Sequence, residues 1–130
     1  MKELKRILQV EDDQDILDIA ALSLELVGGY ELQQFSKGMD AVKHAAEHDP
    51  DLFLLDVMMP GIGGIETLRG LRQIPQLQAI PAIFMTAKNL SEINVDTDLG
   101  QHVIGVIEKP FDTIQLPEAI REMWAEYQGQ

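Results

Sequence analysis

The stretch Leu52–Gly61, LFLLDVMMPG, is an apolar run of strand length that ends in one carboxylate, Asp56. No polar residue alternates with the apolar ones, so the run predicts a strand that is buried on both faces. A buried carboxylate without a partner is strongly disfavoured. Asp56 must therefore lie at a rim that water or a partner reaches, or be held there for chemistry.

Further strand-length runs and helical patterns alternate along the rest of the chain. The predicted strands are Ile7–Val10, Glu31–Phe35, Leu52–Leu55, Ala82–Met85 and Val103–Ile107. The predicted helices are Gln14–Val27, Ser36–His48, Ile65–Gln73 and Thr113–Tyr127, while the segment 87–101 is polar and only weakly periodic.

The first predicted helix has a clear start signal and a proposed apolar face. Asp13 is expected to cap its N-terminus, and two glycines after Val27 end it. Helical spacing places the following residues on one face: Ile16, Ile19, Ala20, Leu24 and Val27.

Strand then helix, repeated along the chain, predicts an α/β fold with a parallel sheet covered by helices on both faces. Right-handed crossovers make this an open, doubly wound sheet. Such sheets bind ligands beyond the carboxyl ends of their strands. The residues at those ends are therefore the candidates for function.

Polar side chains with complementary chemistry stand at four strand ends. Glu11 and Asp12 follow the first strand, Asp56 the third, Thr86 the fourth and Lys109 the fifth. Clustered carboxylates attract a hard cation, and Mg²⁺ prefers oxygen ligands. A carboxylate also serves as a nucleophile toward a phosphoryl group, which needs little beyond positioning and charge neutralisation.

Composition limits the partners of this chain. It has 130 residues, a formal net charge of −12 and no cysteine. This charge repels nucleic acid and anionic lipid, so we expect no direct nucleic-acid binding and no membrane insertion. We expect a cytoplasmic protein with a single domain over residues 1–130, a core from about 5 to 127 and no output domain.

Histidine and aromatic residues are weaker candidates for a second site. His44 and His48 have the i, i+4 spacing of a metal pair, but no third ligand is evident, which favours a solvated helix face. His102 is expected in a loop. Trp124 and Tyr127 are expected to pack the final helix.

Four motifs in this order resemble the receiver domain of response regulators, including the chemotaxis regulators, in two-component signalling. They are VEDD at Val10–Asp13, LLDVMMPG at Leu54–Gly61, MTAK at Met85–Lys88 and EKPF at Glu108–Phe111. The resemblance covers essentially the whole chain. It implies a flavodoxin-like, five-stranded sheet in the order 2-1-3-4-5 and a cis bond before Pro110.

The same resemblance assigns roles to the residues at the strand ends. Asp56 corresponds to the phosphoacceptor, Thr86 to the residue that moves toward the phosphoryl group, and Lys109 to the lysine that bridges to it. The implied Mg²⁺ ligands are Asp12 directly, Glu11 mainly through water, Asp56 and the Met58 carbonyl.

The resemblance also implies partners and a signalling face. A sensor histidine kinase or histidine phosphotransfer protein would donate the phosphoryl group, with no independent substrate turnover. The segment 87–101, the strand Val103–Ile107 and the helix Thr113–Tyr127 would then contact a downstream protein or form a homodimer. Val106 stands where many receivers have an aromatic switch residue. Met58 offers little to an attacking water, so we expect a long-lived phosphorylated state.

Other functions stay open at this point. A degenerate receiver would act only as a protein-binding module, although the intact acidic set argues against it. A Mg²⁺-dependent phosphatase-like hydrolase would need a general acid two residues after the nucleophile, where this chain has Met58. A flavodoxin is a more distant alternative because acids occupy the place of its phosphate-binding loop.

Overall fold

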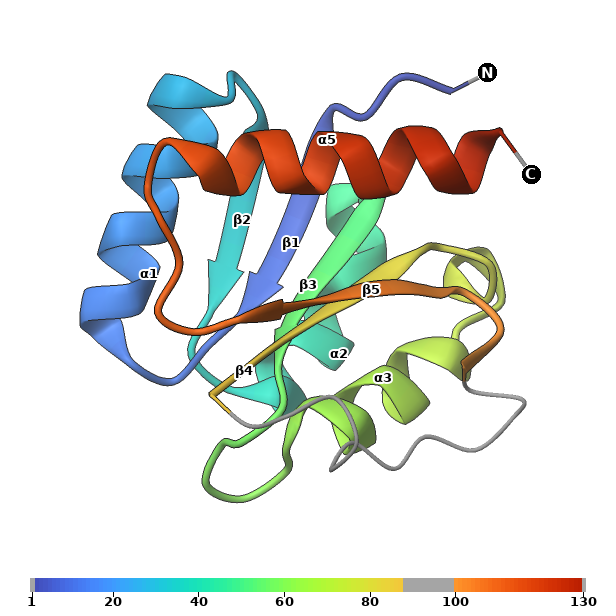
Figure 1. Cartoon of the computed structure of the whole chain (residues 1–130). Helices are drawn as coiled ribbons and strands as arrows, with labels where there is room; N and C mark the ends of the chain where they lie inside the picture. Colours follow the sequence, from blue (N-terminus) through green and yellow to red (C-terminus); the bar gives the residue numbers. More distant parts are fainter. Residues whose placement is uncertain (1, 88–99, 130) are drawn as a thin grey trace.

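A five-stranded parallel sheet forms the centre of the molecule, between two layers of helices (Figure 1). The computed structural model describes residues 2–87 and 100–129. The strands lie in the order β2-β1-β3-β4-β5. Their bounds are β1 Arg6–Val10, β2 Glu31–Phe35, β3 Leu52–Asp56, β4 Ala82–Thr86 and β5 Val103–Glu108. The predicted doubly wound α/β fold and its strand order 2-1-3-4-5 are confirmed.

Helices cover both faces of the sheet (Figure 1). One face carries α1 with its continuation η1, together with α5, and the other carries α2 and α3. Their bounds are α1 Gln14–Ala21, the π-helix η1 Leu22–Val27, α2 Gly38–His48, α3 Gly64–Arg72, the 3₁₀ turn η2 Pro75–Leu77 and α5 Gln115–Gln128. Most of the segment 87–101, including Lys88, lies outside the described residues.

The apolar run Leu52–Leu55 forms most of the central strand β3. All five of its residues are buried. Phe53 and Leu55 belong to the core between the sheet and α2/α3, whereas Leu52 and Leu54 belong to the core under η1 and α5. The strand therefore needs apolar side chains at successive positions, and only its last residue, Asp56, reaches the edge of the sheet.

The start of α1 agrees with the sequence prediction. Asp13 is the N-cap, and its carboxylate accepts a hydrogen bond from the backbone N–H of Asp15 at 2.9 Å. This cap fixes the turn between β1 and α1. Glu11 and Asp12 lie in that turn, directly before the cap.

The predicted apolar face of this helix is partly wrong. Ile19 and Val27 are 44% and 51% exposed, whereas Leu17 is buried. In η1 the N–H of Gly28 bonds to the carbonyl of Ser23, five residues back, at 2.9 Å. A uniform period of 3.6 residues does not anticipate such π-helical winding, which changes the side that later residues face.

The outer strand β5 pairs irregularly with β4 near its start. Ala82 pairs with Val103, but Ile83 pairs with Gly105, so one residue of β5 is left between the two pairs. A Cβ atom on Gly105 would lie 2.5 Å from the sulfur of Met123 in α5. The glycine that interrupts the fifth apolar run thus allows α5 to approach the sheet.

Among the residues that the structure describes, no helix is both long enough and apolar enough to cross a lipid bilayer.

Asp51 fastens the start of β3 to the chain before β1, at the edge of the sheet opposite Asp56. Its carboxylate accepts hydrogen bonds from the backbone N–H groups of Lys5 and Arg6 at 3.0 and 2.9 Å, and lies 3.0 Å from the Lys2 ammonium. Burial alone would raise the pKa of Asp51, but these donors stabilise the charged form more. The net result is a pKa below the ordinary aspartate value.

We predict that Asp51→Asn lowers the free energy of unfolding at pH 7 by about 1–3 kcal/mol, because a buried charge-assisted contact is lost. A lowered folded-state pKa stabilises the fold fully above the unfolded value, near 4, and loses that effect as the pH falls below it. The difference between wild type and variant in urea unfolding should therefore shrink below about pH 4. Asp49→Asn, at an exposed ion pair with Arg6, is the control and should change little. A pH-independent difference would contradict this account.

Gly64 begins α3 directly against the backbone of the residue that carries the candidate nucleophile. A Cβ atom there would lie 2.3 Å from the carbonyl oxygen of Asp56 and 2.9 Å from its carbonyl carbon. Backbone atoms cannot swing aside as a flexible side chain does. The absence of a side chain at Gly64 thus permits the tight return of the chain over the end of β3.

We predict that Gly64→Ala destabilises the fold by about 1–3 kcal/mol, because the methyl group overpacks a rigid site. Chemical denaturation followed by circular dichroism measures the change. Gly129→Ala is the matched control, since its nearest contact is 3.4 Å, and it should stay within about 0.5 kcal/mol of wild type. Equal stabilities of the two variants would show that the chain relaxes freely around position 64.

Candidate functional site

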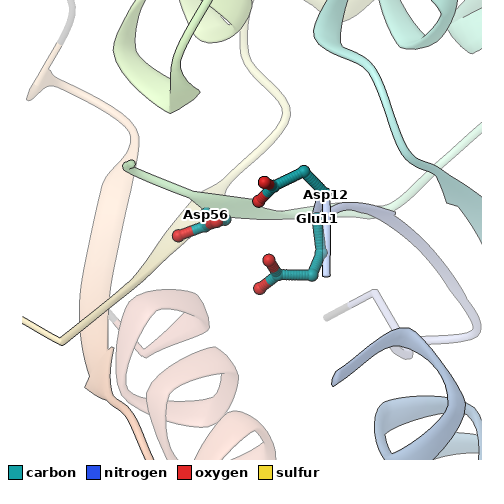
Figure 2. A group of neighbouring side chains, drawn as sticks. All are labelled: Glu11, Asp12 and Asp56. Carbon is teal, nitrogen blue, oxygen red and sulfur yellow. The ribbon is translucent and has the colours of Figure 1, made fainter. Parts of the chain in front are cut away.

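The parallel sheet brings the predicted site residues to one edge, because every strand ends on the same side. Glu11 and Asp12 follow β1, Asp56 is the last residue of β3, Thr86 is the last of β4 and Lys109 follows β5. Figure 2 shows the three carboxylates, with the side chains of Glu11 and Asp12 extending toward Asp56 from the end of the neighbouring strand. The convergence predicted from the sequence is thus present in the structure.

The three carboxylates form a compact group of oxygen ligands. One oxygen from each of Glu11, Asp12 and Asp56 lies within 4.8 Å of the others. Glu11 and Asp56 are 1% and 3% exposed, whereas Asp12 is exposed. The group therefore has a buried floor and one side open to water.

Lys109 supplies the positive charge that this group needs. Its ammonium nitrogen lies 2.5 Å from Glu11 Oε1 and 3.1 Å from Asp56 Oδ1. Its backbone N–H donates to the carbonyl of Thr86 at 2.8 Å, which ties the end of β5 to β4. The Lys109–Pro110 bond is cis, as the resemblance implied.

Burial and charge shift the titration of both partners in this contact. Burial, together with the nearby Asp56 carboxylate, raises the pKa of Glu11 to about 7, although Lys109 opposes the shift. Burial acts to lower the pKa of Lys109, but hydrogen bonds and attraction from Glu11 and Asp56 outweigh it and the net shift is upward. Lys109 therefore stays an ammonium over the whole neutral range.

Backbone donors hold the carboxylates in place. The N–H of Met58 donates to Asp56 Oδ1 at 3.3 Å, and the N–H of Asp13 donates to Glu11 Oε2 at 3.2 Å. Thr86 is almost fully buried. It stands one residue beyond Met85, which pairs with Asp56 across β3 and β4. The site residues thus lie on rigid strand ends and short turns.

The donor set suits a hard divalent cation. It offers carboxylate oxygens only, and Mg²⁺ binds through one or two carboxylates while keeping several waters. The ammonium of Lys109 neutralises only part of the charge of three nearby carboxylates, which leaves a net attraction for a cation.

A groove beside Asp12 was not predicted from the sequence. It has a volume of about 580 Å³ and is lined by Asp12 and two connecting segments, 36–39 and 59–62. Met39 in this groove is 70% exposed. The two segments are distant in the sequence, and only their assembly in space brings them beside Asp12.

The histidines take no part in a metal site with other described residues. The ring of His44 stacks on Phe35 with ring centroids 6.4 Å apart, and His48 also packs against Phe35 at 5.9 Å. His102 contacts the hydroxyl of Tyr127 through Nδ1 at 2.8 Å, just before β5. Trp124 packs in the core under α5 as predicted, and its indole N–H donates to the Lys2 carbonyl.

Comparisons with known proteins agree with this geometry. Residues 7–121 match the response regulator receiver domain. The phosphate regulon transcriptional regulatory protein PhoB of Rhizobium meliloti (strain 1021) is 33% identical over 120 residues. The match covers 92% of this chain and 52% of that protein, so the chain spans about half the length of this curated relative.

Solved structures show the same fold. The response regulator TrrA from Thermotoga maritima, in complex with Mg²⁺ and BeF, has a TM-score of 0.74 at 27% identity, covering 92% of this chain and 99% of that one. The chemotaxis protein CheY4 of Vibrio cholerae has a TM-score of 0.80 at 24% identity, covering 93% and 99%. The motifs, the sheet order and the matched region together show that this chain belongs to the response regulator receiver domain family of two-component systems.

Proposed function

We propose that this protein accepts a phosphoryl group on Asp56 in a Mg²⁺-dependent reaction. The observation that carries the proposal is the arrangement around Asp56, with Lys109 at 3.1 Å and two further carboxylates within 4.8 Å. Membership of the receiver family supports it. We infer that residues 1–130 make up one receiver unit, since the matched region includes all five strands.

Each residue has a distinct part in the proposed reaction. An oxygen of Asp56 attacks phosphorus, the bond from phosphorus to the donor's imidazole nitrogen breaks, and an acyl phosphate forms as that nitrogen leaves. Lys109, already beside Asp56 Oδ1, pairs with a phosphoryl oxygen. The Thr86 hydroxyl donates a hydrogen bond to another.

Mg²⁺ would be held by Asp12, Asp56 and the Met58 carbonyl, with Glu11 acting mainly through water. Bound there, the ion would neutralise charge that develops on the phosphoryl oxygens. The carboxylates within 4.8 Å and the exposed position of Asp12 support this assignment. The complex of TrrA with Mg²⁺ and BeF, at 27% identity, supports the same chemistry here.

The proposed donor is a sensor histidine kinase or a histidine phosphotransfer protein. The surface beside Asp12 is open, which leaves room for a donor side chain to approach Asp56. The free energy of the transfer comes from the donor's phosphorus–nitrogen bond. This chain therefore assists its own phosphorylation and does not turn over a separate substrate.

We propose that phosphorylation alters the face formed by α5, β5 and the segment before β5, and that a downstream protein or a second copy binds there. A groove of about 190 Å³ on this face is lined by residues of β5 and α5, among them Ile104, Met123 and Tyr127. Val106 is half-buried against the core on the α3 side. Its side chain is smaller than an aromatic ring, so we expect a smaller side-chain movement at this position on phosphorylation.

We predict that incubation with acetyl phosphate and Mg²⁺ adds one phosphoryl group to the intact chain, measured by mass spectrometry. Asp56→Asn should carry none, because it lacks the nucleophilic carboxylate, and EDTA should prevent the addition in wild type. Asp13→Asn is the control, since that carboxylate caps α1 and lies outside the ligand group.

Two other outcomes would contradict parts of this proposal. Phosphorylation that persists in Asp56→Asn would move the acceptor to another residue. A folded protein that neither binds Mg²⁺ nor takes up the phosphoryl group would be a protein-binding module, the degenerate receiver.

We predict that Met58→Asn shortens the lifetime of the phosphorylated state by about tenfold, because an amide can hold the attacking water with a hydrogen bond. Loss of the phosphoryl group is followed by mass spectrometry after the donor is removed. Met39→Asn, at another exposed methionine near the site, should leave the lifetime unchanged. Equal lifetimes in wild type and Met58→Asn would exclude this role for position 58.

A further inference from the structure

Ser23, on η1, carries a fully buried hydroxyl. Its Oγ donates a hydrogen bond to the backbone carbonyl of Thr113, a residue 90 positions later, at 2.5 Å. The carbonyl belongs to the connection between β5 and α5, which begins at Lys109. This buried hydrogen bond links η1 to a connection that is far away in the sequence.

The π-helical winding of η1 accompanies this contact. The carbonyl of Ser23 accepts from the N–H of Gly28 at 2.9 Å, which is the five-residue spacing of a π-helix. Ser23 and Leu24 are both fully buried, whereas Leu22 and Leu26 are 51% and 77% exposed. The wide winding thus turns a serine toward the β5–α5 connection and leaves apolar side chains outside. Short π-helical segments are frequently found at functional sites.

The β5–α5 connection is fixed at both of its ends. At its start, the N–H of Lys109 donates to the Thr86 carbonyl at 2.8 Å. At its end, Asp112 Oδ1 accepts from the N–H groups of Ile114 and Gln115 at 2.8 and 3.0 Å, which caps α5. Those contacts lie within the connection or with its neighbouring strand. Ser23 adds an anchor from the helix that follows Glu11 and Asp12.

We propose that Ser23 is a positioning residue for phosphoryl binding: through Thr113 it holds the connection that places the Lys109 ammonium beside Asp56. This proposal rests on the proposed function, in which Lys109 contacts the phosphoryl group. The continuous helix α1–η1 then joins both sides of the site, since α1 begins directly after the proposed metal ligands and Ser23, near the start of η1, holds the connection that follows Lys109.

A second side-chain contact on the same helix provides the matched control. Gln34 Nε2 donates to the carbonyl of Leu17 at 2.8 Å and to Gln9 Oε1 at 2.8 Å. It fastens α1 to β1 and β2 but has no contact with the β5–α5 connection among the described hydrogen bonds. Gln34→Met keeps the volume and removes the donor, so it tests whether loosening α1 alone has any effect.

The first experiment measures fluoroberyllate binding at saturating Mg²⁺ by titration calorimetry, with Mg²⁺ affinity measured separately. We expect Ser23→Ala to weaken fluoroberyllate binding about three- to tenfold, the effect of one lost hydrogen bond, with Mg²⁺ affinity within about twofold of wild type. Ser23→Thr, which keeps the hydroxyl, should restore most of the affinity, and Gln34→Met should match wild type. If Ser23→Ala does not fold by circular dichroism, Ser23→Cys replaces it as a variant of similar size with a weaker donor.

A double-mutant cycle with Lys109→Ala tests whether Ser23 acts through the lysine. We expect Ser23→Ala to have no further effect on fluoroberyllate binding once Lys109 is removed. An equal effect in both backgrounds would overturn the proposal. An equal loss in Gln34→Met would also overturn it, since general loosening of α1 would then explain the result.

Amide hydrogen exchange in the unphosphorylated protein separates this proposal from the proposed function. Ser23→Ala should speed exchange at Lys109 and Phe111–Thr113, whereas Gln34→Met should not. If wild type binds neither acetyl phosphate's phosphoryl group nor fluoroberyllate, the proposed function fails, while the exchange rates still decide whether Ser23 holds the connection. Unchanged exchange in Ser23→Ala would refute the role of Ser23.

Discussion

The contact on which the site depends is the Lys109 ammonium between Glu11 and Asp56. Two nearly buried carboxylates within 4.8 Å of each other and of Asp12 would repel strongly in a low-dielectric setting. The ammonium offsets this repulsion only in part. The remaining negative charge makes the group attractive to a cation, so the contacts of Lys109 bring the carboxylates together without fully neutralising them.

The sheet makes that contact possible because all five strands run in the same direction. Residues that are distant in sequence then meet at one edge, because each helical crossover returns the chain to the opposite edge before the next strand begins. Each of these side chains is held by the end of a strand. The opposite edge has a different task. There the Asp51 carboxylate accepts hydrogen bonds from the backbone at the start of β1 and stabilises the fold. The stabilising carboxylate and the candidate site thus lie at opposite ends of β3.

The sequence predicted the strands, and the convergence of polar residues at their ends, from local signals. The predicted strand Glu31–Phe35 coincides with β2 at both of its ends, and the polar residues after the other four runs gave Glu11, Asp12, Asp56, Thr86 and Lys109. Features that depend on packing were missed. Val27 lies in the π-helix η1, whose winding departs from the assumed helical period, while Ile19 lies in the regular helix α1 beside the buried face formed by Leu17 and Ala20. The bond from Ser23 to Thr113 joins segments with no pattern in common. The groove near Asp12 likewise arises only when two turns meet in space.

The exposed apolar side chains of α1 and η1 have a consequence for how the protein behaves in concentrated solution. Ile19, Leu22, Leu26 and Val27 are all at least 44% exposed, and residues 7–36 contain seven acids but no lysine or arginine. Apolar surface promotes self-adhesion, while like charge around it keeps copies apart. Colloidal stability thus comes from electrostatic repulsion, with a net charge of −12 over the chain. High salt screens that repulsion, and acid removes it as the carboxylates are protonated, so either condition favours association through these exposed apolar side chains.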